Sequence, residues 1–229
     1  MTKAKVTASV KKHKVTKPKS GSLDVSWCLN LLKKNYPDAY CALNYSNPFQ
    51  LLIATILSAQ CTDERVNIVT KDLFKKYKKP SDLADEDVLV IEQYIRSAGF
   101  YKNKAKNIKA CCQILKEKHN NVVPKTLDEL VELPGVGRKT ANVVLGNAYG
   151  ISSGVVVDTH VTRLANRFGW VKIIDAVKIE QKLNAMFDQS EWIVLPHYLI
   201  FHGRAICKAR SPDCESCFLA TRCPRKGLS

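Results

Sequence analysis

The chain has 229 residues, 45% hydrophobic and 25% charged, so it is long enough to be an enzyme of one or two domains and has an ordinary globular composition. No apolar run approaches the roughly 18 residues of a membrane span, and the first residues lack the apolar core of a secretory signal. We therefore expect an intracellular protein with no membrane association. The net charge of +15 indicates a polyanionic partner and favours nucleic acid over an anionic membrane.

The positive charge is spread unevenly along the chain. Residues 1–22 hold seven lysines and no acidic residue, which leaves 29 basic and 21 acidic residues, a net charge of +8, for the remainder. A polar segment with a run of like charges cannot bury a core. We expect residues 1–22 to form a basic disordered tail, and a dedicated binding or targeting arm is the alternative.

Apolar residues recur at helical spacing along most of the remaining chain, which predicts an all-α fold. Segment 48–60 is apolar nearly all round, with Asn47 placed to cap it and Pro48 in its first turn, as in a buried central helix. Segment 63–77 has a single apolar stripe behind a capping Asp63, which predicts an amphipathic surface helix.

Three more helices are predicted from the same spacing. One carries Val88, Ile91 and Ile95 on a single stripe. The next has an apolar face of Ala105, Ile108, Cys112 and Leu115 and an opposite face of Lys102, Lys106 and Lys109. The third, within residues 160–168, ends at Gly169. The intervening GVVVD at 154–158 is the only strand-like stretch, and we expect a buried extended linker near a domain boundary.

A helical hairpin is predicted around LPGVG at residues 133–137. A capping box at residues 126–129 begins a first helix, the LPGVG turn breaks it, and a second helix starts at once. Gly135 and Gly137 let a phosphate approach the main chain, where the unpaired N–H groups and the helix dipole favour an anion. An ordinary tight turn between two helices is the alternative.

Four of the nine cysteines lie within seventeen residues near the C-terminus, whereas the other five are scattered among apolar neighbours and read as core residues. The four are Cys207, Cys214, Cys217 and Cys223. Such density indicates a metal site, because a reducing compartment disfavours a disulfide framework. Four thiolates suit either a tetrahedral zinc or a [4Fe–4S] cluster, and the spacing alone leaves both open.

The segment LPGVGRKTANVVL resembles the helix-hairpin-helix motif of DNA glycosylases, specifically the endonuclease III family. The resemblance continues through LLIATILSAQCTD, GFYKNKAKNI, VVVDTHVTRLANR and the terminal cysteines, so it covers nearly everything after the tail. It implies a [4Fe–4S] cluster and two helical domains, 41–151 and 23–40 plus 152–229, with a DNA-binding cleft between them. It also implies a bifunctional DNA glycosylase and AP lyase that removes oxidised pyrimidines.

In that family the lysine after GVGR is the nucleophile and the aspartate of VDTH is its partner, which here are Lys139 and Asp158. A helix N-terminus and the neighbouring Arg138 both disfavour an ammonium, which favours the neutral amine that a nucleophile requires. From the residues alone, Lys139 could equally contact a phosphate, and Asp158 could be a helix N-cap. Arg138 is expected to bind phosphate.

The resemblance implies further contacts with DNA. Gln60 fills the gap left by a flipped base and Phe100 is the wedge, where many relatives carry leucine; a core aromatic is the alternative for Phe100. Lys208 and Arg210 in the cysteine loop reach phosphate. We expect a monomer that acts on double-stranded DNA containing damaged bases or abasic sites, in the nucleoid-associated cytoplasm if the organism is prokaryotic. A monofunctional mismatch glycosylase and a non-catalytic DNA-binding module are the alternatives.

Overall fold

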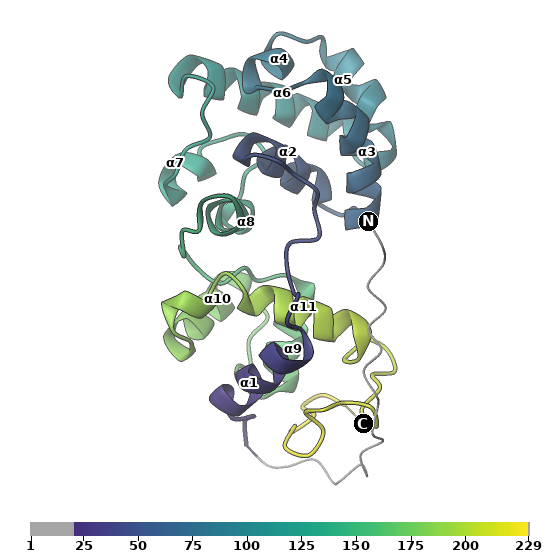
Figure 1. The fold of residues 1–229 in the computed structure, drawn as a ribbon, viewed down its shortest axis with the longest axis vertical. Coiled ribbons are helices and arrows are strands. Elements are labelled where there is room, and N and C mark those ends of the chain that lie inside the picture. The colour runs from purple at the N-terminus through teal and green to yellow at the C-terminus, as the bar shows by residue number, and fades with distance from the viewer. Residues whose placement is uncertain (1–20, 229) are drawn as a thin grey trace. The chain divides into compact units, whose positions relative to one another are not determined.

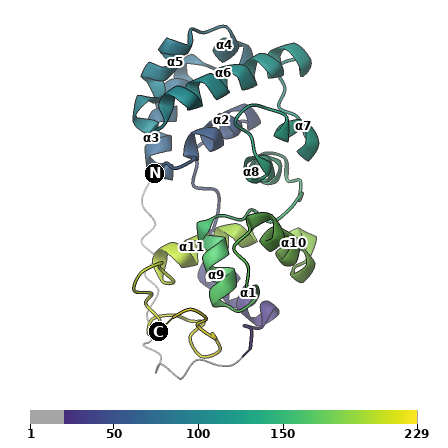
Figure 2. The same cartoon turned by 180° about the vertical axis from the view of Figure 1, so that it is seen from behind.

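The computed structural model describes residues 21–228, so residues 1–20 of the expected basic tail lie outside the described residues. All regular secondary structure within residues 21–228 is helical (Figures 1 and 2), which confirms the predicted all-α class. None of these helices is both long and apolar enough to cross a membrane. The chain divides into a terminal unit, Met1–Tyr40 with Gly154–Ser229, and a central unit, Cys41–Ser153. The prediction places the second boundary two residues earlier, after residue 151.

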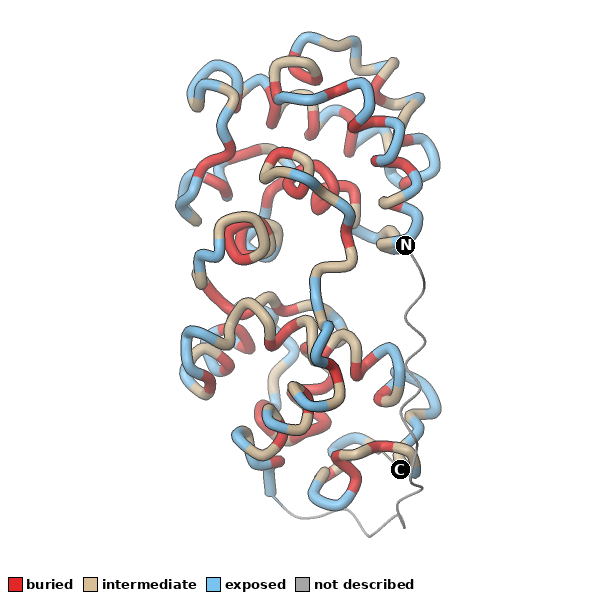
Figure 3. Tube along the Cα trace, in the orientation of Figure 1, coloured by how far each residue is buried: buried red, intermediate tan, exposed pale blue. Residues whose placement is uncertain are grey.

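The central unit is built around one buried helix, α2 (Pro48–Ser58), which packs against α3, α6 and α8. Its Asn47 cap accepts a hydrogen bond from the Gln50 amide at 2.9 Å, and every residue from Leu51 to Leu57 is buried (Figure 3), as the apolar run predicts. The other elements of this unit are α3 (Asp63–Lys76), α4 (Pro80–Ala84), α5 (Val88–Ile95), the 3-10 turn η1 (Arg96–Ala98), α6 (Tyr101–Lys118), α7 (Leu127–Val131) and α8 (Arg138–Tyr149).

The start of α3 differs by one residue from the prediction. Thr62, not Asp63, is the N-cap, and its hydroxyl accepts a hydrogen bond from the Arg65 amide at 3.3 Å. Asp63 is instead the first helical residue, where a carboxylate still benefits from the positive end of the helix dipole. Both residue types suit a helix start, so spacing to the first apolar residue does not distinguish them.

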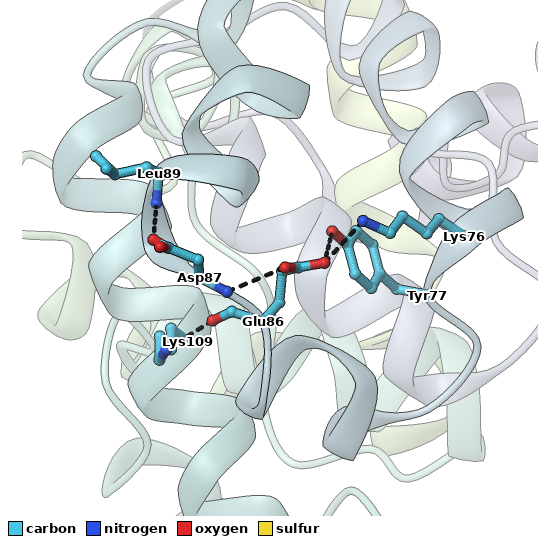
Figure 4. A network of polar contacts seen from close by, with 6 residues as sticks. All are labelled: Lys76, Tyr77, Glu86, Asp87, Leu89 and Lys109. Atoms are coloured by element: carbon cyan, nitrogen blue, oxygen red, sulfur yellow. Dashed lines mark hydrogen bonds and ion pairs between the residues drawn. The ribbon is translucent and has the colours of Figure 1, made fainter.

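A polar network joins the end of α3, the start of α5 and α6 (Figure 4). The Glu86 carboxylate accepts hydrogen bonds from Lys76 Nζ at 2.7 Å and from the Tyr77 hydroxyl at 2.8 Å. Lys109 Nζ donates to the Glu86 carbonyl at 2.6 Å. Lys102 and Lys106 are exposed as predicted, but Lys109 is half-buried and anchors the loop before α5. The exposed basic face of α6 is therefore narrower than the sequence predicts.

The terminal unit combines an N-terminal helix with the C-terminal third of the chain. Its elements are α1 (Val25–Asn35), α9 (Thr159–Arg167), α10 (Ala176–Met186), the 3-10 turn η2 (Gln189–Glu191) and α11 (Leu195–Ala205). Trp170 packs edge-on against Phe168 and Phe187 with ring centroids 5.0 and 5.3 Å apart, and its indole N–H donates to the Leu23 carbonyl at 2.8 Å. The segment before α9 has no strand, and Val155 is buried, which confirms the extended linker.

Candidate active site and metal centre

The hairpin turn between α7 and α8 is held by two buried residues and shaped by a glycine. Leu133 and Val136 lie in the core, and the Val136 amide donates to the Leu133 carbonyl at 3.0 Å. Gly135 has φ +78°, and a Cβ there would lie 3.0 Å from Asn107 Cβ. A side chain at this position is therefore disfavoured by both the backbone conformation and the packing.

Gly137 has no comparable reason to be glycine within the fold. It is the N-cap of α8 with φ −91° and ψ 173°, an extended conformation open to any residue, and a Cβ there would meet nothing within 4 Å. It supplies no side-chain cap, whereas Asp24, Asn47, Thr62, Asp87, Thr126, Asp158 and Asp175 cap their helices. The first N–H groups of α8 and the space beside them are thus suited to an external anion.

Lys139 is the second residue of α8 and its side chain is exposed. Arg138 precedes it, is also exposed, and opens the helix. A helix fixes the backbone of both residues, while the long side chains stay at the surface, so an incoming molecule can reach the Lys139 amine. The first turn of α8 therefore offers backbone N–H donors, the guanidinium of Arg138 and the primary amine of Lys139.

Asp158 belongs to the terminal unit and is the N-cap of α9. Its Oδ1 accepts a hydrogen bond from the Val161 amide at 2.8 Å, so the capping role suggested by the sequence is present. The side chain is half-buried, and a carboxylate has a second oxygen that can accept further hydrogen bonds. Burial lowers the pKa of nearby Arg163, Arg167 adds to that effect, and Asp158 opposes it.

Four predicted ligands meet in the terminal unit. Cys207, Cys214, Cys217 and Cys223 line one pocket together with Arg167 and His202. All nine cysteines are unpaired, so no disulfide competes for these thiols. Burial raises the pKa of Cys217 to about 12, with the other three cysteines adding to the effect, so an uncompensated group of thiolates is unfavourable there.

The four thiols lie around one pocket, which can be compared with the two candidate metal groups. No three or more His, Cys, Asp or Glu side chains in residues 21–228 converge on the position of a single metal ion. A structural zinc requires four sulfurs about 2.3 Å from one point. Four cysteines around one pocket provide the thiolate set that an iron–sulfur cluster also uses.

Buried polar side chains hold the cysteine loop. Arg167 NH1 donates to Cys207 Sγ at 3.3 Å and to the Lys208 carbonyl at 2.6 Å. His202 Nε2 lies 3.6 Å from Cys217 Sγ, while its Nδ1 lies 3.0 Å from the Tyr36 hydroxyl. Burial lowers the pKa of His202 to about 4, so this imidazole is neutral. Such contacts fix ligand orientation, as the outer shell of a metal centre does.

The remaining predicted contact residues lie at the surface. Lys208 and Arg210 are exposed, whereas the carbonyls of Cys207, Lys208 and Ala209 accept hydrogen bonds from Arg167. The loop backbone is thus anchored while both basic side chains face outward from it. That arrangement suits contact with phosphate.

Gln60 and Phe100 share an uncommon backbone conformation in the central unit. Their φ angles are +54° and +47°, in the left-handed region that costs a side chain about 1–2 kcal/mol. Phe100 is 67% exposed, so the alternative of a core aromatic is wrong. Two exposed residues held in strained conformations are typical of a functional surface.

Three residues that contact the cysteine loop, Arg163, Arg167 and His202, were not predicted. Arg163 and Arg167 lie four residues apart on α9, and this spacing indicates that both side chains lie on one face of the helix. His202 stands within the apolar LIFHG, and a polar residue in such a run indicates a buried hydrogen-bonding role.

The chain matches known families in both units. Residues 53–189 match the HhH-GPD superfamily base excision DNA repair protein, and residues 207–223 match the iron-sulfur binding domain of endonuclease III. Endonuclease III of Synechocystis sp. is 52% identical over 86% of this chain and 90% of its own length. Endonuclease III of Escherichia coli is 41% identical over 86% of this chain and 93% of its own length.

Solved structures give the same grouping. A non-covalent endonuclease III–DNA complex superimposes with a TM-score of 0.84 at 48% identity, covering 88% of this chain and 94% of that one. A thermostable thymine-DNA glycosylase shares the fold, with a TM-score of 0.78 at 21% identity over 86% of this chain and 94% of that one. The chain belongs to the endonuclease III family of helix-hairpin-helix DNA glycosylases, which binds a [4Fe–4S] cluster.

Proposed function

We propose that the chain, a DNA glycosylase and AP lyase of base excision repair, removes oxidised pyrimidines and cleaves the backbone 3′ to the abasic site. The observation that carries the proposal is Lys139, an exposed amine in the first turn of α8, at a helix start with no side-chain cap. A backbone phosphate bound to these N–H groups would place DNA beside that amine. Gly137 leaves the room for it.

In the proposed reaction, Lys139 Nζ attacks C1′ of a flipped nucleotide, and the bond from C1′ to the base breaks with its electron pair leaving on the base. Asp158 accepts the proton released by the attacking amine, and its charge stabilises the positive character that develops on the sugar. Sugar ring opening gives an imine between Nζ and C1′. A water molecule then takes a proton from C2′, the freed electron pair forms the C2′=C3′ double bond, and the C3′–O bond breaks so that the 3′ phosphate leaves.

The other contacts follow from charge and exposure. We assign Gly135, Gly137 and Arg138 to the phosphate site, and Lys208 and Arg210 to a second backbone contact. Gln60 fills the space left by the flipped nucleotide, and Phe100 enters the base stack, because each is exposed on a strained turn. We also propose that the protein acts as a monomer inside the cell, on the nucleoid if the organism is prokaryotic.

The lesion class can be tested with matched duplexes that contain an oxidised pyrimidine, a mismatched thymine or adenine, or an abasic site. Strand cleavage at the oxidised pyrimidine and at the abasic site is expected. Excision of a mismatched base that leaves the strand intact would favour a monofunctional mismatch glycosylase. Binding with no reaction on any duplex would favour a non-catalytic DNA-binding module.

Substituting the two hairpin glycines by alanine should have opposite consequences. Gly135→Ala is expected to lower the free energy of unfolding by about 2 kcal/mol, because φ is positive and Asn107 lies against the new Cβ. Gly137→Ala should change it by less than about 1 kcal/mol, yet weaken DNA binding roughly tenfold by obstructing the phosphate. Denaturant unfolding and duplex titrations measure the two effects. Unchanged DNA affinity in Gly137→Ala would contradict the assignment of a phosphate site at the start of α8.

We propose Cys207, Cys214, Cys217 and Cys223 as the cluster ligands, so Cys214→Ser should lower the iron content and abolish the visible absorption of anaerobically purified protein. Cys112→Ser is the control, because Cys112 is a buried thiol of the central unit. This control should keep about four irons per chain. A single zinc per wild-type chain, or loss of iron from the control alone, would contradict the assignment.

A further inference from the structure

Two loops of the central unit carry the residues assigned above to duplex opening. Gln60 lies in the loop after α2, and Phe100 lies in the turn between η1 and α6, directly after Gly99. Phe100 is the N-cap residue of α6 and supplies no side-chain cap. The two loops are about 40 residues apart in the sequence, so their relative position depends on tertiary contacts between the elements that carry them.

Lys104 contacts the ends of the two elements that lead into these loops, α2 and η1. Its Nζ donates to the Leu57 carbonyl at 2.8 Å and to the Ala98 carbonyl at 2.7 Å. Leu57 stands three residues before Gln60, and Ala98 stands two residues before Phe100. The Lys104 residue is only 6% exposed, although it is a lysine in the first turns of α6.

The placement of this ammonium follows from the helix ends around it. The last carbonyls of a helix have no intrahelical partner, and Leu57 and Ala98 lie at the C-terminal ends of α2 and η1. A cation is favoured at such ends because the helix dipole is negative there. Burial lowers the pKa of Lys104, an effect that nearby Cys61 opposes, so the carbonyl oxygens are the groups that compensate for lost hydration.

An apolar side chain of similar length could fill the same volume, but it would leave two buried carbonyls without donors. The loops would then be joined only through packing. Lys102 and Lys106 on the same helix are exposed, so the burial of Lys104 is specific to its position.

We infer that Lys104 is a positioning residue that holds the Gln60 loop and the Phe100 turn in one fixed arrangement, so that gap filling and wedging occur together. This inference rests on the proposed function for the roles of Gln60 and Phe100. Lys104 contacts neither the substrate nor the reacting atoms. Its loss should therefore impair opening of paired DNA more than the chemistry of Lys139.

The direct test is amide hydrogen exchange in the intact protein. Lys104→Gln, which keeps an amide donor on a shorter side chain, is the variant of choice, and Lys104→Met is the more severe one. Exchange should accelerate roughly tenfold in peptides covering both 58–62 and 97–101, with peptides of the terminal unit unchanged. Acceleration in one loop alone, or uniformly across the central unit, would overturn the inference.

A kinetic test separates positioning from stability. Single-turnover cleavage of a paired duplex with an oxidised pyrimidine should fall roughly 10- to 100-fold in Lys104→Gln. Borohydride trapping on a single-stranded abasic oligonucleotide, which needs no duplex opening, should fall less than about threefold. Lys118→Gln, an exposed lysine at the far end of α6, is the matched charge control and should resemble wild type on both substrates.

The failures of the two proposals are distinguishable. A folded Lys104→Gln variant that loses activity equally on both substrates, or keeps it on both, overturns the positioning role. Wild-type protein that reacts with neither substrate contradicts the proposed function, and the exchange experiment still decides whether Lys104 holds the two loops together.

Discussion

Substituting Lys139 by glutamine is expected to lower strand cleavage at an abasic site by about a thousandfold or more, because an amide cannot form the imine. DNA affinity should fall only a few fold, since one exposed charge at the start of α8 is lost. Lys139→Arg separates the two roles that the sequence leaves open. Arginine keeps a cation for phosphate but cannot act as the amine nucleophile, so this variant should bind DNA normally and be equally inactive.

Single-turnover cleavage and duplex titration measure these effects, with Lys118→Gln as the control for loss of a lysine elsewhere. Substantial activity in Lys139→Arg would make Lys139 a phosphate contact. In that case another amine would have to form the imine, and the assignment of the nucleophile would be withdrawn.

Substituting Asp158 by asparagine should lower base excision on the order of a hundredfold while leaving stability nearly unchanged. Asparagine caps helices as well as aspartate does, so the hydrogen bond to the Val161 amide is retained while the charge is removed. Asp158→Ala should lose the same activity and also about 1 kcal/mol of unfolding free energy, because the cap is lost as well.

Asp175 provides the matched control, because it caps α10 in the same unit and accepts a hydrogen bond from the Lys178 amide at 2.9 Å. Asp175→Ala should cost about the same stability as Asp158→Ala and leave excision intact. If Asp158→Asn excised bases at the wild-type rate, the carboxylate would be a helix cap alone.

The sequence predicts local features well where neighbouring residues determine them. The all-apolar run of α2 with Asn47 and Pro48 at its start, and the helix after Asp158, have the predicted boundaries within about two residues. The prediction of Asp63 as the cap of α3 was wrong, because the preceding Thr62 can accept the same kind of amide hydrogen bond.

The burial of a side chain could not be predicted where it depends on residues that are distant in the sequence. Lys104, Lys106 and Lys109 share one helix, yet Lys104 is buried against two helix ends, Lys106 is exposed and Lys109 is bonded to the Glu86 carbonyl. Their environments depend on the packing of α2, η1 and the loop before α5. No spacing within α6 encodes those partners, and the same holds for His202 beside Cys217.

We propose that the Lys139 amine forms the covalent bond with the sugar. Wild-type protein incubated with an abasic duplex and borohydride, then digested and analysed by peptide mass spectrometry, reports that bond directly. A reduced adduct is expected on the peptide containing Lys139, and none is expected in Lys139→Gln. An adduct on a different lysine or on the N-terminal amine, or an undiminished adduct in Lys139→Gln, would contradict this proposal.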